Sequence, residues 1–295
     1  MISALLASAV FMNIFNYIIP KKSLNYELVA RMARAQILNM IHRAGTGHAG
    51  SNLSCVEILL ALYGEILNID PKNPQNPDRD RFILSKGHAA AALWVTLAGR
   101  GFFPKAVLST YCQDGGLLPG LVTENTVPGV EVSLGSLGTG FPFACGLALA
   151  AKKNNASYKI FCLLSDGELD EGSVWEAMLF APQHHLDNLV AIVDYNKIQS
   201  YARIDEIISI EPLAKKARAF GWTVKEIDGH NIKKIISAFR NIPKRKNKPT
   251  FIIAHTIKGK GISFLQDSVS SHHTKISASN LAIALQELSI HSDQL

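Results

Sequence analysis

The segment that decides the fold spans residues 159–177 and reads Lys-Ile-Phe-Cys-Leu-Leu-Ser-Asp-Gly-Glu-Leu-Asp-Glu-Gly-Ser-Val-Trp-Glu-Ala. Its start, 159–164, is a short apolar run of the length expected for a strand buried on both faces. A turn and a helix-forming segment, 174–180, follow it. In an open parallel sheet, ligands bind beyond the carboxyl ends of the strands, so Asp166 is a carboxylate in a favoured position. Gly167 lets the backbone approach a ligand closely.

A second strand is predicted at 189–194, and Asn196 lies just beyond it, 30 residues after Asp166. If the two strands are parallel neighbours, their carboxyl ends lie side by side. Carboxylate, amide and backbone carbonyl oxygens are hard ligands that suit Mg²⁺, which completes its shell with water and ligand phosphates. The simpler alternative is that Asp-Gly forms a turn and Asn196 caps the next helix. The spacing alone leaves both interpretations open.

Three further strand patterns, separated by helical patterns, lie at 81–84, 222–228 and 249–255. Helical apolar spacing occurs at 24–44, and an apolar helix is expected at 53–67, capped by Ser51 or Asn52. This alternation predicts an α/β fold, one doubly wound domain with a mainly parallel sheet and helices on both faces.

The composition favours an intracellular globular domain. The chain has 295 residues, of which 47% are hydrophobic, enough for one large α/β domain. Its four cysteines lack metal-ligand spacing, which favours free thiols in a reducing cytoplasm over disulfides. Part of the net charge of +6 lies in the basic segment 244–248. No aromatic residues are interleaved there for base stacking, so a solvated loop is favoured over nucleic-acid binding.

Residues 1–23 form an apolar extension, whose role the sequence leaves open, ahead of a domain expected at 24–295. No charged side chain occurs in 1–19, and this length approaches the ~20 residues of a membrane-spanning helix. The extension lacks the basic start of a secretory signal, and two asparagines interrupt it. We favour a packing extension, or a misassigned start with Met12 as first residue, over a membrane anchor.

Asp-Gly, an interval of about 30 residues and Asn together resemble the thiamine diphosphate motif. Two surrounding sequence segments resemble segments of transketolase. They read Ser165-Asp-Gly-Glu-Leu-Asp-Glu-Gly-Ser-Val-Trp-Glu-Ala177 and Asp194-Tyr-Asn-Lys-Ile-Gln199. The resemblance runs from about Leu28 to His273 and covers the N-terminal half only, as in split, two-subunit transketolases. It implies the thiamine diphosphate-binding fold, thiamine diphosphate and Mg²⁺ as cofactors, and a metal-binding transferase of carbohydrate metabolism.

The resemblance also implies a cofactor site, residue by residue. The metal ligands would be Asp166, Asn196 and the backbone carbonyl of Ile198. The cofactor itself would be bound by side chains and by glycine-rich backbone, namely His88, Gly135, Ser136, Leu137, Asp166, Gly167, Asn196 and His272.

Three catalytic candidates come from the same resemblance. His48 corresponds to a histidine over the thiazolium and the sugar donor, although Ala49 replaces the usual proline. His272 corresponds to a histidine that contacts the diphosphate and the donor, although the usual Trp before it is missing. Glu171 resembles a glutamate that helps couple two active sites across the subunit interface. A solvated carboxylate at a helix start is the alternative for Glu171.

The chain departs from the family pattern at a residue that contacts substrate. Counting back from Pro128-Gly-Val-Glu131 places Leu121 where the family has a histidine that contacts the donor hydroxyls. Leu cannot form that hydrogen bond, and a buried hydroxyl left unpaired costs about 1–3 kcal/mol. The ordinary ketose phosphate donor is therefore in doubt. Thr139 stands where Gln is usual, while Asp228-Gly-His230 matches the family, and we interpret its histidine as structural.

The Glu that activates the aminopyrimidine belongs to the family's pyrimidine-binding domain, which has no counterpart here. The resemblance therefore implies a C-terminal partner subunit that supplies this Glu, in a heterotetramer with two copies of each subunit. The expected reaction transfers a two-carbon ketol unit from a sugar or sugar phosphate donor to an aldehyde acceptor. The alternatives are an acyloin-forming or 2-keto acid-using enzyme subunit, and a non-catalytic regulatory subunit.

Overall fold

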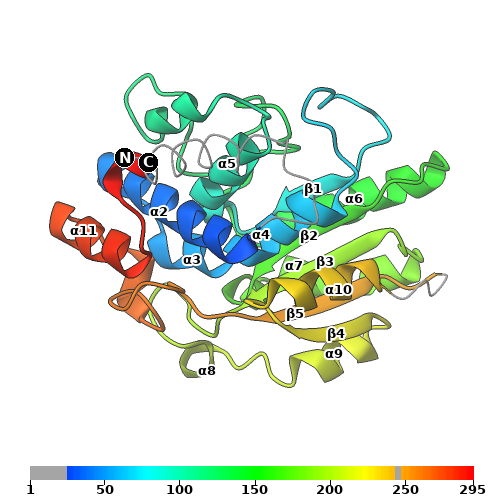
Figure 1. Ribbon diagram of the computed structural model, residues 1–295. Coiled ribbons are helices and arrows are strands. Elements are labelled where there is room, and N and C mark those ends of the chain that lie inside the picture. Colours follow the sequence, from blue (N-terminus) through cyan, green and yellow to red (C-terminus); the bar gives the residue numbers. More distant parts are fainter. Residues whose placement is uncertain (1–24, 243–246) are drawn as a thin grey trace.

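A computed structural model describes residues 25–242 and 247–295. The extension 1–23 and most of the basic segment 244–248 lie outside the described residues, so the interpretations of both remain predictions. One sheet with the order β1-β2-β3-β5-β4 crosses the centre of the molecule (Figure 1). Its strands are β1 (Arg81–Leu84), β2 (Ile160–Ser165), β3 (Leu189–Tyr195), β4 (Thr223–Asp228) and β5 (Thr250–His255). Every neighbouring pair is parallel.

Helices pack on both faces of this sheet, as a doubly wound fold requires (Figure 1). One face carries α2 (Tyr26–Ala44), α3 (Ala49–Ser54), α4 (Val56–Ala61), α5 (Ala90–Gly99), α10 (Ile232–Arg240) and α11 (Ala278–Glu287). The other face carries α6 (Gly140–Lys153), α7 (Gly172–Gln183), α8 (Ile204–Ile207) and α9 (Leu213–Ala219). The predicted fold class is confirmed.

The two central strands explain why the sheet is covered on both sides. Every residue of β2 and β3 is buried. Because successive side chains of a strand point to opposite faces, Phe161 and Leu163 join one hydrophobic core while Ile160, Cys162 and Leu164 join the other. The edge strand β4 instead has mostly half-buried residues. A continuous apolar run in the sequence therefore marks a central strand.

The segment predicted as one capped helix at 53–67 is divided differently. Helix α3 ends at Ser54, α4 follows from Val56, and a π-helical turn covers Leu62–Ile66. The capping role expected for Ser51 or Asn52 is wrong, because both residues lie inside α3. Tertiary contacts explain the difference. The Asn52 side chain donates to the His48 carbonyl (2.9 Å) and accepts from the Ala92 N–H (2.8 Å) in the first turn of α5.

The cysteines agree with the expectation of free thiols. All four cysteines are free thiols, and three of them are buried. Within 25–242 and 247–295, no helix combines the length and apolar character needed to cross a membrane.

Candidate active site

The carboxyl ends of β2 and β3 lie side by side, with Ser165 beside Asp194 in the parallel register. Asp166 follows β2 and is only 2% exposed. Its carboxylate accepts from the N–H of Gly167 (2.8 Å) and from the N–H of Lys197 beyond β3 (2.5 Å). Burial, and then the nearby Asp194 carboxylate, raises the pKa of Asp166 to about 7. A buried carboxylate of this kind is stabilised in its charged form by a cation.

Asn196 and Ile198 contribute oxygens at the same sheet edge. The Asn196 side-chain carbonyl accepts from the N–H of Ile198 (3.1 Å), which fixes the turn after β3. The backbone carbonyl of Ile198 accepts from Nζ of Lys258 (3.1 Å), in the loop after β5. The fold therefore brings Asp166, Asn196 and Ile198 to one place, as the strand arrangement predicts. These oxygens are the donor types that Mg²⁺ prefers.

Three predicted histidines form a group beside this edge. The ring centroid of His48 lies 5.3 Å from that of His88 and 5.0 Å from that of His272, and the His88 and His272 centroids are 5.6 Å apart. Burial lowers the pKa of each ring, and nearby cations add to this effect. For His272 the pKa falls to about 3, with Lys258 as the largest charged contributor. At neutral pH the three imidazoles are neutral.

His273 joins this group from its exposed side. The ligand nitrogens of His48, His272 and His273 lie within 4.8 Å of one another, close enough to suggest a metal site. However, Lys258 Nζ lies 3.1 Å from Nδ1 of His272. An adjacent ammonium opposes a cation and attracts an anion. The histidine group therefore suits a phosphate-like ligand better than a metal ion.

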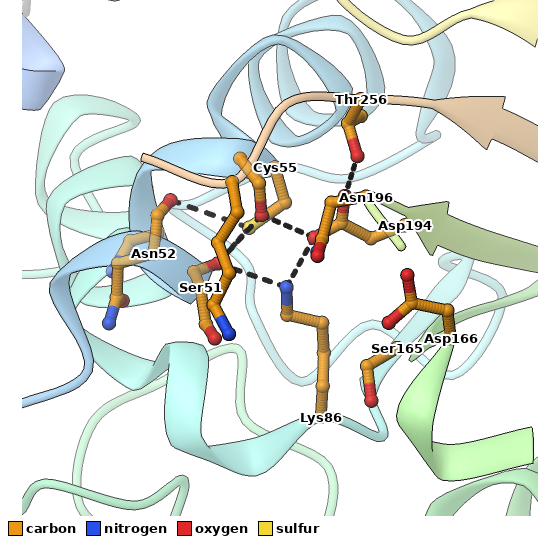
Figure 2. Close-up of polar contacts among 12 residues, drawn as sticks. Ser51, Asn52, Cys55, Lys86, Ser165, Asp166, Asp194, Asn196 and Thr256 are labelled. Atoms are coloured by element: carbon orange, nitrogen blue, oxygen red, sulfur yellow. Dashed lines mark hydrogen bonds and ion pairs between the residues drawn. The ribbon is translucent and has the colours of Figure 1, made fainter. Parts of the chain in front are cut away.

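A buried ion pair that sequence reasoning missed lies at the centre of the site. Figure 2 shows Lys86, from the loop after β1, reaching to Asp194 at the end of β3. Both side chains are fully buried, with Nζ 2.5 Å from Oδ2 of Asp194 and 2.9 Å from the carbonyl of Ser51. Asp194 also accepts hydrogen bonds from the hydroxyls of Ser54 and Thr256. The pair therefore connects α3, the end of β3 and the loops after β1 and β5.

The charges of this pair are mutually stabilised. Burial works to raise the pKa of Asp194, but Lys86 and the two hydroxyls bring that pKa below its usual value. Burial likewise works to lower the pKa of Lys86, but Asp194 raises it. Both groups are therefore charged at neutral pH. Removal of either partner alone would leave the other as an unpaired buried charge.

Lys258 is the second cation that sequence reasoning did not single out. Its ammonium donates to the carbonyls of Ile198 (3.1 Å) and Gln199 (2.7 Å). Burial lowers the pKa of Lys258 to about 8, although Asp166 opposes the shift. No local pattern marks this residue, because the contacts of Lys258 depend on segments that are distant in sequence.

The glycine-rich run of residues 135–140, which leads into α6, borders the site. The N–H of Gly138 donates to Oε1 of the buried Glu168 (2.9 Å), and its carbonyl accepts from the Ser173 hydroxyl (2.7 Å). Gly138 has φ +79°, and a Cβ there would lie 2.7 Å from Cβ of Glu171. Only glycine fits this conformation and this space without strain. Glu171, at the start of α7, is exposed beside this run.

Gly135, Ser136 and Leu137 lie at the start of that run, with the first two exposed. A Cβ placed on Gly135 would lie 3.1 Å from Cδ1 of Leu121. Leu121, 42% exposed, therefore borders the backbone predicted to face the cofactor.

Comparison with known proteins identifies the family of this chain. The family described as "Transketolase, thiamine diphosphate binding domain" matches residues 26–294. The chain belongs to the transketolase family. It is 43% identical over 259 residues to the 6-deoxy-6-sulfo-D-fructose transketolase subunit SqwG of Clostridium sp., in a match that covers 88% of this chain and 94% of that protein. It is 40% identical over 269 residues to an apulose-4-phosphate transketolase subunit of Phocaeicola vulgatus. That match covers 91% of this chain and 95% of that protein.

Longer transketolases match in part. The chain is 32% identical to transketolase from Campylobacter jejuni, with a TM-score of 0.83, and the match covers 90% of this chain and 42% of that one. The chain likewise spans 41% of human transketolase, at 38% identity. It thus spans about two fifths of the full-length transketolases it matches and nearly all of the named subunits. The predictions of a split-transketolase N-terminal subunit and of a transketolase-type transferase are confirmed.

Proposed function

We propose that this chain is the diphosphate-binding subunit of a two-subunit transketolase that transfers a two-carbon ketol unit between sugar substrates. The observation that carries the proposal is the meeting of Asp166 and Asn196 at the ends of β2 and β3, beside the three histidines. Thiamine diphosphate would supply a nucleophilic carbon that adds to a carbonyl and stabilises the resulting carbanion. The protein residues must then anchor, orient and neutralise this cofactor.

The residues fit a Mg²⁺ ion. Asp166 and Asn196 offer two hard side-chain oxygens from adjoining backbone segments. The Ile198 carbonyl accepts from Nζ of Lys258, and its second lone pair would bind the metal. Mg²⁺ binds six oxygen ligands in octahedral geometry, and water and substrate phosphates usually supply some of them. Three protein ligands therefore leave positions for a diphosphate. The raised pKa of Asp166 supports this assignment, because a bound cation would compensate the cost of its burial.

The histidine group and Lys258 fit the diphosphate itself. Lys258 offers positive charge. A Cβ on Gly167 would lie 3.0 Å from Cγ of Gln199, so glycine avoids crowding at this turn. His88 and His272 are neutral, so each can donate one N–H to a phosphate oxygen. His48 lies against both rings and is the candidate for contact with the donor sugar. The backbone of Gly135, Ser136 and Leu137 would face the rings of the cofactor.

A second polypeptide would complete the enzyme. The named relatives that this chain covers almost fully are called subunits, whereas full-length transketolases are more than twice as long as the matched region. We infer that the partner supplies the pyrimidine-binding half and its activating Glu, with two copies of each subunit in a cytoplasmic complex. Glu171 would lie near the interface, since it is exposed beside the glycine-rich run.

Leu121 bears on the identity of the sugar donor. Leu121 cannot form the hydrogen bond that the family histidine makes to the donor hydroxyls. Two relatives are named for 6-deoxy-6-sulfo-D-fructose and for apulose-4-phosphate. Together these observations support a donor other than xylulose 5-phosphate, with a modified ketose as the first class to examine.

The test is an assay of the chain purified with its partner subunit. We expect thiamine diphosphate- and Mg²⁺-dependent ketol transfer with at least one donor from a panel of ketose phosphates, sulfonated ketoses and 2-keto acids. We expect the chain alone to be inactive, since the proposed partner supplies the activating Glu. Turnover by the pure chain would contradict the proposed two-subunit organisation. Turnover with 2-keto acids only would favour an acyloin-forming enzyme, and cofactor binding without any turnover would favour a regulatory role.

A further inference from the structure

His230 lies in the turn after β4 and connects two parts of the molecule. Its side chain is 12% exposed. One ring nitrogen, Nδ1, lies 3.1 Å from Oε2 of Glu57 on α4, and the other, Nε2, accepts a hydrogen bond from the backbone N–H of Ile257 (2.8 Å). Ile257 directly precedes Lys258. The imidazole therefore joins a helix to the loop that carries the cation of the candidate site.

These contacts fix the form of the imidazole. A backbone N–H can only donate, so Nε2 of His230 must be the acceptor. A carboxylate can only accept, so the proton of the ring lies on Nδ1 and is donated to Glu57. His230 is therefore neutral with a single tautomer, and both of its nitrogens are used by the protein itself.

Glu57 is a rigid anchor for this imidazole. Its carboxylate is 2.8 Å from Nη2 of Arg34 on α2, and that guanidinium also donates to the carbonyl of Leu53 (3.2 Å). Burial works to raise the pKa of Glu57, but the hydrogen bond from His230 and the charge of Arg34 lower it to about 2. Glu57 is therefore charged, buried and held from both sides.

The backbone around Lys258 is held at both neighbouring residues. Ile257 donates to His230 on one side, and the N–H of Gly259 donates to the carbonyl of Gly50 (3.0 Å) on the other. Lys258 thus extends its ammonium to Ile198, Gln199 and His272 from a fixed backbone. Loss of the His230 acceptor would leave the N–H of Ile257 without that bond, and the loop would shift to satisfy it.

We propose that His230 is a positioning residue for cofactor binding, which acts by holding the Ile257–Lys258 backbone so that Lys258 faces the diphosphate. This inference rests on the proposed function. His230 touches neither cofactor nor substrate in this role. Its effect should appear in the affinity for thiamine diphosphate rather than in the rate at saturating cofactor.

Three substitutions separate the two bonds of His230. Glutamine places its carbonyl oxygen near the position of Nε2, so His230→Gln keeps the acceptor for Ile257. Asparagine places its amide nitrogen near the position of Nδ1, so His230→Asn keeps the donor to Glu57 only. His230→Ala keeps neither. The matched control is His255→Ala at the end of β5, an exposed histidine whose Nε2 lies 3.3 Å from Oε2 of Glu226.

The experiment measures Mg²⁺-dependent binding of thiamine diphosphate to the assembled two-subunit complex by calorimetry, together with kcat at saturating cofactor and thermal unfolding. We expect the Kd to rise about tenfold in His230→Ala and His230→Asn. In His230→Gln and His255→Ala it should stay within about threefold of the wild type. The kcat of all four should remain within about twofold. Equal loss in the Gln, Asn and Ala variants, or unchanged binding in His230→Ala, would overturn the proposal.

A double-substitution cycle tests whether His230 acts through Lys258. If it does, adding His230→Ala to Lys258→Ala should weaken cofactor binding by less than about twofold further, because the positioned group is already gone. Fully additive losses would show that His230 acts by another route and would overturn the proposal. Absence of cofactor binding in the wild-type complex would instead overturn the proposed function, and this role with it.

Discussion

The two ends of the candidate active site are built differently. At the proposed metal and diphosphate end, Asp166, Lys86 and Asp194 are buried, and Asp166, Gly167 and Asn196 match the family motif. At the substrate end, Leu121 is exposed and replaces a family histidine. The buried end depends on compensated charges, where a single change leaves a charge unpaired. A substitution at the exposed end leaves no buried charge unpaired, so we expect donor choice to vary there more readily than cofactor binding.

Removing the metal ligand should have the largest effect. Asp166→Ala deletes the one carboxylate in the proposed Mg²⁺ site, so we expect no detectable Mg²⁺-dependent binding of thiamine diphosphate by calorimetry on the assembled complex. Asp187→Ala, an exposed carboxylate just before β3, is the matched control. Unchanged affinity in Asp166→Ala would contradict the metal assignment.

Breaking the buried ion pair should destabilise the fold itself. Lys86→Met leaves Asp194 as a buried carboxylate without its cation, and we expect the free energy of unfolding to fall by about 3–5 kcal/mol in urea titrations. The double variant Lys86→Met/Asp194→Asn should recover much of this loss, since no unpaired charge remains. Equal stability of the single and double variants would show that the pair is not charged as described.

The charge of Lys258 predicts a pH dependence of cofactor binding. The pKa of Lys258, lowered to about 8, means that the ammonium is charged below pH 8 and loses its charge as the pH rises through that value. We therefore expect the affinity for thiamine diphosphate to decline above about pH 8. The decline in affinity should be at most about tenfold per pH unit, as for the loss of one proton. Lys258→Arg, which stays charged, should bind with a flat profile to higher pH. A wild-type profile that is flat from pH 7 to 9.5 would count against Lys258.

At the exposed end the expected effect is smallest. Leu121→His would restore one hydrogen bond to a neutral hydroxyl, worth about 0.5–1.5 kcal/mol. The specificity constant for xylulose 5-phosphate should rise roughly two- to twelvefold in the assembled complex. Leu117→His, an exposed leucine in the same segment, should change little. Efficient use of xylulose 5-phosphate by the wild type would remove the reason to expect an unusual donor.

The fold was predictable because its central strands have a strong local signal. The apolar runs before Asp166 and before Asn196 need no tertiary information, and the parallel neighbours they form are observed in β2 and β3. The edge strand β4 (Thr223–Asp228) lies within the strand pattern predicted at 222–228. The break at Cys55 was not, because α3 and α4 are separated by packing around Asn52 rather than by proline or glycine.

The site was predictable only where a motif carries it. Asp166, Asn196, His48, His88 and His272 came from spacing and resemblance, and the fold brings them together. The buried contacts around these residues were missed, because Lys86–Asp194 and His230–Glu57 join residues more than a hundred positions apart. Contacts of that kind follow from the packing of the whole sheet, not from any local pattern.

The distance in sequence between His48 and His272 has a consequence for synthesis on the ribosome. His48 leaves the ribosome well before Lys258 and His272, which follow it by more than two hundred residues. Domains fold as units as the chain emerges, and parallel sheets form slowly because their strands are joined by long connections. Any nascent chain that stops before β5 and the following loop therefore lacks part of the histidine group. Capture of the proposed cofactor must therefore wait until β5 and the loop after it have emerged.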